Sequence, residues 1–211
     1  MRKHADQKRQ RCQSSEQILE FFRRDPNDFL SRMVIMDETC LYHYDSETKQ
    51  QSIERWHTGS LHPKKFRVQK SAGKFLASIF QDQDGILLID YLPKGQTINA
   101  EYYLSLLVQL KDILKEKRRG KFTKEVLFLH DNAPAHRSLA TQKQMAYLGF
   151  QYLDHPLYSP DLAPSDYHLF PGLKKKQLKS RHFFSEAEVI AAVETWLDGQ
   201  PSEFFWVACK S

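Results

Sequence analysis

Hydrophobic residues follow two different spacings along the chain, and the first half is dominated by short apolar runs. Such runs, when bounded by polar or turn-forming residues, are typical of strands. The segment Gln-Asp-Gly at 83–85 lies between two of them and predicts a tight turn that joins a pair of strands. The strands expected before residue 93 are 33–36, 41–44, 75–80 and 86–92.

After residue 98 the apolar residues recur at helical spacing. Asn99 can cap the first of three expected helices, and Gly149 can close the second. Ser185 and Glu188 form a capping box at the start of the third. The expected helices are 99–117, 138–148 and one that begins at 185. The inner stripe of the first helix consists of Tyr103, Leu107, Leu110 and Leu114.

Two further strands are expected between these helices. Residues 126–129 form a continuous apolar run, as in a strand buried on both faces, and 150–153 are expected to form another short strand. Strands come first, and helices and strands then alternate. This order predicts an α/β fold, in which a mixed sheet has helices packed on its faces.

The N-terminal region has a different composition from the rest. Residues 1–13 are dense in Lys, Arg and Gln, which predicts an exposed basic arm. Ser14 and Gln17 make a capping box for a short helix that ends at Asp25-Pro26, because the residue before proline avoids helical geometry. We therefore expect a basic arm and linker helix at 1–30, and one folded domain at 31–211.

Composition and charge indicate what kind of protein this is and which partners it can have. The chain has 211 residues, of which 41% are hydrophobic and 27% charged, as in ordinary globular domains. No apolar run approaches the roughly 20 residues that cross a bilayer, so no membrane partner is expected. Three distant cysteines with no CxxC pair indicate neither a zinc knuckle nor a disulfide framework, and fit a reducing compartment. The net charge of +5 favours a polyanionic partner such as nucleic acid, although many basic proteins bind none.

Three aspartates stand at positions that suit metal-ion chemistry. Asp37 follows the first apolar run, Asp131 follows the run 126–129, and Asp166 lies at an expected helix start. Adjacent strands present their ends at one edge of a sheet, so distant aspartates can converge there. Mg²⁺ prefers hard oxygen ligands, and a pair of ions can serve phosphoryl transfer. For each aspartate taken singly, a role in a turn or helix cap is the alternative.

The two later aspartates lie in long and unusual strings, HDNAPAH at 130–136 and YSPDLAPSDYH at 158–168. These strings resemble the signature blocks of mariner-family DNA transposases, whose second and third aspartates are separated by 34 residues. The same number separates Asp131 from Asp166, whereas Asp161 would leave 29. The family's first aspartate matches Asp37, which is followed by Glu38. The resemblance extends from about Ser14 to about Phe205.

The resemblance implies an RNase H-like fold, with Mg²⁺ or Mn²⁺ as the cofactor and no small-molecule cofactor. It implies a metal-dependent DNA endonuclease and strand transferase that acts in transposition, with DNA as partner and the nucleus as location. Asp37 and Asp131 would bridge the metal ions and Asp166 would bind one of them. Dimerisation through Ser14–Arg24 is also implied, although that segment could equally pack on its own domain. The residues expected around the metal ligands are Glu38, His130, Asn132 and His168.

Two other clusters have open interpretations. The basic run near Asp166 either contacts DNA phosphates or is a solvated helix face. The histidines at 130, 136 and 168 suggest a zinc hydrolase, but His130 and His136 are six residues apart and fit no helical ligand pair. An orienting or packing role is favoured for them. The basic run consists of Lys174, Lys175, Lys176, Lys179 and Arg181.

The sequence also departs from the family pattern. Intact members carry N-terminal helix-turn-helix domains, which are expected to be missing here. Cys40 and Gln81 stand where the family usually has tryptophan, and the segment after Phe205 suggests a truncated C-terminus. These departures support a rival interpretation, in which the chain is a catalytically inactive, transposon-derived fragment that binds nucleic acid or merely folds.

Overall fold

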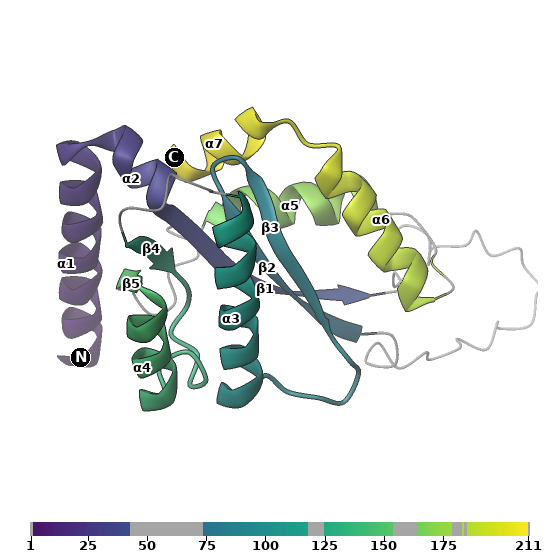
Figure 1. Ribbon diagram of the computed structural model, residues 1–211, viewed down its shortest axis with the longest axis horizontal. Helices are drawn as coiled ribbons and strands as arrows, with labels where there is room; N and C mark the ends of the chain where they lie inside the picture. The colour runs from purple at the N-terminus through teal and green to yellow at the C-terminus, as the bar shows by residue number, and fades with distance from the viewer. Residues whose placement is uncertain are drawn as a thin grey trace, which may run out of the picture.

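The protein is built on a mixed sheet of five strands in the order β3-β2-β1-β4-β5 (Figure 1). The computed structural model describes residues 2–42, 74–117, 125–153, 164–178, 183 and 185–210. β1 is antiparallel to β2 and parallel to β4, β2 is antiparallel to β3, and β4 is parallel to β5. This confirms the predicted mixed sheet. The strands are β1 (Met33–Tyr42), β2 (Lys74–Asp82), β3 (Gly85–Leu92), β4 (Val126–Leu129) and β5 (Phe150–Leu153).

Helices cover both faces of this sheet. Phe80 on β2 packs with the buried side of α3, whereas its neighbour Ile79 packs with the C-terminal helices, because successive strand residues point to opposite faces. A third cluster joins α2 to β1, β4 and β5. The helical segments are α1 (Arg2–Arg24), α2 (Pro26–Arg32), α3 (Ala100–Lys117), α4 (Leu139–Leu148), η2 (Ser165–Leu169), α5 (Phe170–Gly172), η3 (Leu173–Leu178), α6 (Glu186–Asp198) and α7 (Ser202–Lys210).

The predicted helix ends are confirmed by their caps. The Asn99 side chain accepts a hydrogen bond from the Tyr102 amide at 2.8 Å, and Ser185 accepts one from the Glu188 amide at 3.3 Å. Gly149 ends α4 with φ of 74°, a left-handed conformation that glycine adopts without strain. The turn before Gly85 and the strands on either side of it also agree with the prediction.

The N-terminal region differs from the prediction. α1 is one helix from Arg2, so the residues expected as an exposed basic arm are helical, and Ser14 lies inside the helix rather than at its start. Arg, Lys, Gln and Ala have good helix propensity, which lets the helix extend from the anchored turn near Phe21 and Phe22. Within the N-terminal part of this helix, Arg9 and Cys12 are exposed.

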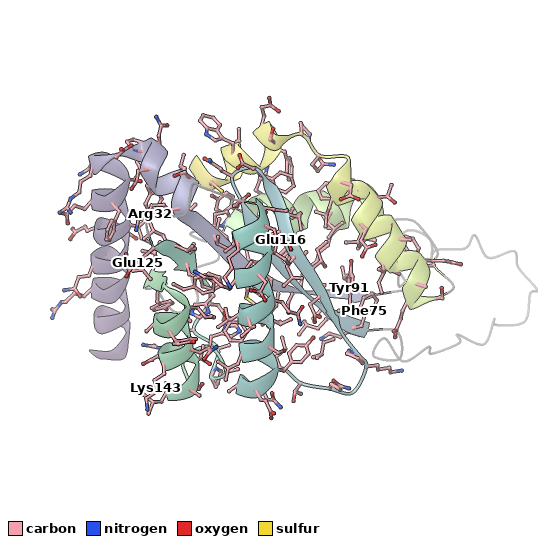
Figure 2. The ribbon with its side chains drawn as sticks, viewed as in Figure 1. Arg32, Phe75, Tyr91, Glu116, Glu125 and Lys143 are labelled. Carbon is pink, nitrogen blue, oxygen red and sulfur yellow. The ribbon has the colours of Figure 1, made fainter. Side chains whose placement is uncertain are left out.

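The link between α1 and the sheet is a second helix, which the sequence reading treated only as a helix end. Asp25 caps α2 through a 3.0 Å hydrogen bond from the Asp28 amide, and Pro26 occupies its first turn. Phe29 is buried, and Arg32 donates to the carbonyl oxygen of Glu125 before β4 at 2.8 Å (Figure 2). The boundary expected between residues 30 and 31 thus falls inside a helix that packs on the sheet.

β1 also differs from expectation, since 33–36 and 41–44 were expected as separate strands. One strand runs from Met33 to Tyr42, because β2 pairs with it continuously from Ile35 onward. The two neighbouring strands β2 and β3 are further joined by the ring pair of Phe75 and Tyr91, labelled in Figure 2. Asp37 therefore lies within a strand rather than at its end. No helix in the described parts of the chain is long and apolar enough to span a bilayer.

Candidate active site

The strand register brings Asp37 and Asp131 to the same level. β1 and β4 run parallel, with Met33 opposite Leu127 and Ile35 opposite Leu129. Asp37 comes two residues after Ile35, and Asp131 comes two residues after Leu129. β4 ends at Leu129 while β1 continues to Tyr42, so Asp37 lies on β1 just beyond the end of β4, where the segment that carries Asp131 begins. The convergence of the aspartates stays a prediction, which this register supports.

Asp37 lies between two apolar clusters on one face of the sheet. Ile35, on the same face of β1, belongs to the cluster with α2, and Leu41 belongs to the cluster with α6 and α7. The Asp37 carboxylate accepts a 2.7 Å hydrogen bond from the Glu38 amide through Oδ1. Its Oδ2 is buried and has no hydrogen-bond partner among the described residues. A buried carboxylate oxygen without a donor is costly unless a cation compensates it.

The electrostatic environment of Asp37 adds to this cost. The pKa of Asp37 is raised from 3.8 to about 7, mainly by burial and further by the negative charges of Asp166 and Asp131, against the Glu38 amide hydrogen bond that lowers it. Both other aspartates therefore act on Asp37 through space. The negative charges of Asp131 and Asp166 thus make the ionised form of Asp37 less favourable, which a divalent cation nearby would offset.

Asp131 is held in a different way. Its Oδ1 accepts hydrogen bonds from the Ala133 amide at 3.0 Å and from Nδ1 of His136 at 2.6 Å. Burial acts to raise the pKa of Asp131, but the hydrogen bonds from His136 and Ala133 and the charges of His136 and His130 outweigh it, so the pKa is lowered from 3.8. Asp131 is therefore ionised at neutral pH, with its side chain 59% exposed.

Asp166 is presented by an unusual helical segment. It is exposed and lies in η2, a π-helical turn that begins at Ser165. The amide of Phe170 donates to the carbonyl oxygen of Ser165, five residues earlier. π-helical turns often occur at functional sites. The helical run continues through α5 into η3, so Pro171 neither ends it nor begins a separate helix.

Gln81 connects β2 to the start of this segment. Its side chain is buried, and Nε2 donates to Oγ of the buried Ser165 at 3.3 Å. Ser165 directly precedes Asp166. A hydrogen bond thus joins β2 to the segment that carries the third aspartate, at the position where the family usually has tryptophan.

The residues expected around the ligands are placed as follows. Glu38 lies on the face of β1 opposite Asp37, 3.2 Å from Nε2 of His136. Nδ1 of His130 is 2.5 Å from the Tyr103 hydroxyl, and Asn132 accepts a hydrogen bond from Tyr152 at 3.1 Å. The remaining candidate, His168, instead packs against Phe204 of α7, with ring centroids 4.2 Å apart and the two rings tilted by 41°.

His136 carries a positive charge at neutral pH. Burial acts to lower its pKa, but the hydrogen bond to Asp131 and the negative charges of Glu38 and Asp131 outweigh this and raise the pKa from 6.5 to about 9. The Glu38 contact is an ion pair without the alignment of a hydrogen bond, since neither His136 Nε2 nor Glu38 Oε1 has a hydrogen-bond partner in the described chain. The sequence favoured an orienting or packing role for His136 over zinc binding, and no motif pointed to its contact with Glu38.

The donor set favours a hard cation over zinc. The nitrogens of His130 and His136 face Tyr103, Asp131 and Glu38, and their two rings stack at 5.0 Å rather than pointing at one centre. Within the part of the chain that the structure describes, no three His, Cys, Asp or Glu side chains are grouped closely enough to hold an ion as they stand. Carboxylate oxygens suit Mg²⁺ or Mn²⁺, and Oδ2 of Asp37 has no hydrogen-bond donor in the described part of the chain.

The basic run is described only in part. Lys174 is exposed, with Nζ 5.6 Å from the centre of the Phe170 ring. Lys175 and Lys176 belong to η3, but their side chains lie outside the described residues, as do Lys179 and Arg181. Its expected contact with DNA stays a prediction.

Comparison with known proteins gives a consistent result. The family model described as "Transposase (partial DDE domain)" matches residues 45–124. Mariner Mos1 transposase of Drosophila mauritiana is 31% identical over 204 residues, which cover 95% of this chain and 57% of that protein. The chain thus spans little more than half of this relative.

Solved structures agree with the sequence match. The Mos1 transposase catalytic domain with Raltegravir and Mn is 30% identical, with a TM-score of 0.76, and the match covers 95% of this chain and 86% of that one. A Mos1 transposase paired-end complex with the left transposon end is 31% identical, with a TM-score of 0.77 over 97% of this chain and 58% of that one. The predicted RNase H-like fold is confirmed.

Proposed function

Because the chain belongs to the mariner family of DNA transposases and matches its catalytic domain, we propose that it cleaves and joins DNA strands at a site formed by Asp37, Asp131 and Asp166. The observation that carries this proposal is the Asp37 carboxylate. Its Oδ2 is buried without a hydrogen-bond donor in the described chain, and two further aspartates raise its pKa. Such a group is unfavourable in the protein alone and favourable beside a cation.

We propose Mg²⁺ or Mn²⁺ as the cofactor. Asp37 and Asp131 would hold the ions between them, and Asp166 would bind one of them. When bound, divalent ions neutralise charge on the transferring phosphate and lower the pKa of bound water. The charged Asp131 and the half-buried Asp37 are oriented by the chain itself, through the amides of Ala133 and Glu38.

DNA is the proposed substrate and partner. The net charge of +5 favours phosphate binding, and the basic run beginning at Lys174 follows Asp166 closely in the chain. The Mos1 paired-end complex with a transposon end motivates a second copy of the chain as a further partner. A chromosomal DNA substrate would place the protein in the nucleus.

Nicking of supercoiled plasmid in Mn²⁺ tests the activity. We expect the wild type to nick and Asp131→Asn to be inactive, since the substitution keeps the side-chain volume but removes the charge. Asp161→Asn is the matched control, because it changes the neighbouring aspartate that the 34-residue spacing rejects. If neither the wild type nor the control nicks although both are folded, the chain is an inactive remnant of the family.

A further inference from the structure

His136 is buried between carboxylates from two different parts of the chain. Its side chain is 1% exposed. Nδ1 lies 2.6 Å from Oδ1 of Asp131, in the segment after β4, and Nε2 lies 3.2 Å from Oε1 of Glu38 on β1. One ring thus bridges the two elements that supply the first two aspartates of the proposed site.

The ring has little freedom to turn away from these partners. It stacks on His130 with an interplanar angle of 13° and centroids 5.0 Å apart, and it contacts the Tyr103 ring at 4.1 Å. The Tyr103 hydroxyl, 2.5 Å from Nδ1 of His130, fixes the other member of the stack. The stack therefore extends from α3 to the carboxylates.

The backbone around His136 is also held. Its amide donates to the carbonyl oxygen of Ala133 at 3.0 Å, and the Thr141 hydroxyl donates to the carbonyl oxygen of Ala135 at 2.7 Å. Both the turn that carries Asp131 and the start of α4 are thereby fixed. The direction from which His136 approaches Asp131 is set by the fold.

We propose that His136 is a positioning residue, which engages Oδ1 of Asp131 so that the other carboxylate oxygen is turned to the metal ion. Both hydrogen bonds recorded for Asp131, from His136 and from Ala133, fall on Oδ1, while the side chain as a whole is 59% exposed. The Glu38 ion pair ties this arrangement to β1, one residue from Asp37. Groups that orient a metal ligand typically change metal affinity by about 10–100-fold when they are removed.

A packing role for the ring would give a different result from a hydrogen-bonding role. Phenylalanine would fill much of the same space and keep the stack on His130 and Tyr103, but it offers no donor to Asp131. Asparagine places an amide near the position of Nδ1, whereas glutamine places one near Nε2. Whether asparagine or glutamine keeps the Mn²⁺ affinity therefore shows which nitrogen of His136 makes the hydrogen bond that supports metal binding.

The test is calorimetric titration of Mn²⁺ into the wild type and three variants, together with urea unfolding of each. We expect His136→Phe and His136→Gln to bind Mn²⁺ roughly tenfold or more weakly, and His136→Asn to stay close to the wild type. Equal affinity for wild type and a folded His136→Phe, or equal loss in the Asn and Gln variants, would overturn the inference.

The inference rests on the proposed metal site, and the wild-type titration separates the two. No Mn²⁺ binding by the wild type would refute the site itself, whereas wild-type binding with unaffected variants would refute only the role of His136. A measurement that needs no His136 variant guards against unfolding. Nitrogen–proton NMR of the wild type should show a low-field ring N–H signal from His136 that is lost in Asp131→Ala, and absence of that signal in the wild type would contradict the hydrogen bond.

Discussion

Replacing Asp37 by asparagine should stabilise the metal-free protein above neutral pH, although it removes a proposed metal ligand. The pKa of this carboxyl is raised from 3.8 to about 7 by burial and by the neighbouring aspartates. Ionisation is therefore harder in the folded state than in the unfolded state. Folding stability is fully present while the group is protonated in both states, and it is lost as the pH rises from about 4 to about 7.

The size of the effect follows from the two pKa values. At 1.36 kcal/mol per pKa unit, the difference corresponds to about 4 kcal/mol at pH 8 and about 2 kcal/mol at pH 5. Asp37 is only half-buried, so about 4 kcal/mol is an upper figure. Asparagine has nearly the same shape and no charge, and we expect it to recover about 2–4 kcal/mol at pH 8.

Urea unfolding in EDTA at pH 5 and pH 8 measures this directly. The wild type should lose stability between the two pH values, and Asp37→Asn should lose much less. Asp112→Asn is the control, since Asp112 forms an exposed ion pair with Lys115, and such pairs contribute about 0–1 kcal/mol. The reasoning would be refuted if Asp37→Asn were no more stable than the wild type at pH 8, or if both showed the same pH dependence.

Three further predictions concern the metal and the supports of the site. Excess Mn²⁺ should stabilise the wild type by about 2.7 kcal/mol at 100 times its Kd and leave Asp37→Asn unchanged, as thermal unfolding with and without EDTA will show. Gln81→Leu should lower the free energy of unfolding by about 1–3 kcal/mol, because it removes the hydrogen bond that Gln81 donates to the buried Ser165 hydroxyl. Adding Ser165→Ala to this variant should restore part of the lost stability, as measured by urea unfolding. Gly149→Ala should lower the free energy of unfolding by about 1–2 kcal/mol because of its left-handed backbone, since an added Cβ would lie 3.8 Å from its nearest neighbour and so would not clash. Gly95 has a φ of 85° and open space around it, so urea unfolding of Gly95→Ala should show a similar loss of stability.

Local signals predicted the elements whose ends are set by nearby residues. The caps at Asn99, Ser185 and Gly149 need only a side chain or a φ angle within a few positions, and these elements were predicted within one or two residues. The strand 126–129 carries a continuous apolar run because both of its faces are covered. Such features can be read from a short window of sequence.

Features that depend on distant residues were not predictable in this way. β1 continues through Asp37 and Glu38 because β2 pairs with it from Ile35 to Tyr42, and the paired residues are 32 to 46 positions apart in the sequence. α2 looked like a break after Asp25-Pro26, since a window of seven residues cannot reveal that Phe29 and Leu30 will be buried. In both cases tertiary contacts decided the outcome.

The candidate site shows the same division. The positions of Asp37, Asp131 and Asp166 were predicted from motif spacing, and the β1–β4 register accounts for the convergence of the first two. The contacts of His136 with Glu38 and of Gln81 with Ser165 span 98 and 84 residues, and no local pattern marks them. Tyr103 was predicted as core and is indeed buried, but its hydroxyl also holds His130.

Calorimetric titration of Mn²⁺ tests most directly whether the three aspartates form one metal site. The proteins to compare are the wild type, the Asp161→Asn control and the three single variants Asp37→Asn, Asp131→Asn and Asp166→Asn. The account predicts that the wild type and the control bind with similar affinity, whereas each of the three variants binds far more weakly. If Asp166→Asn bound Mn²⁺ as tightly as the wild type, or if Asp161→Asn abolished binding, the assignment of the third ligand would be contradicted.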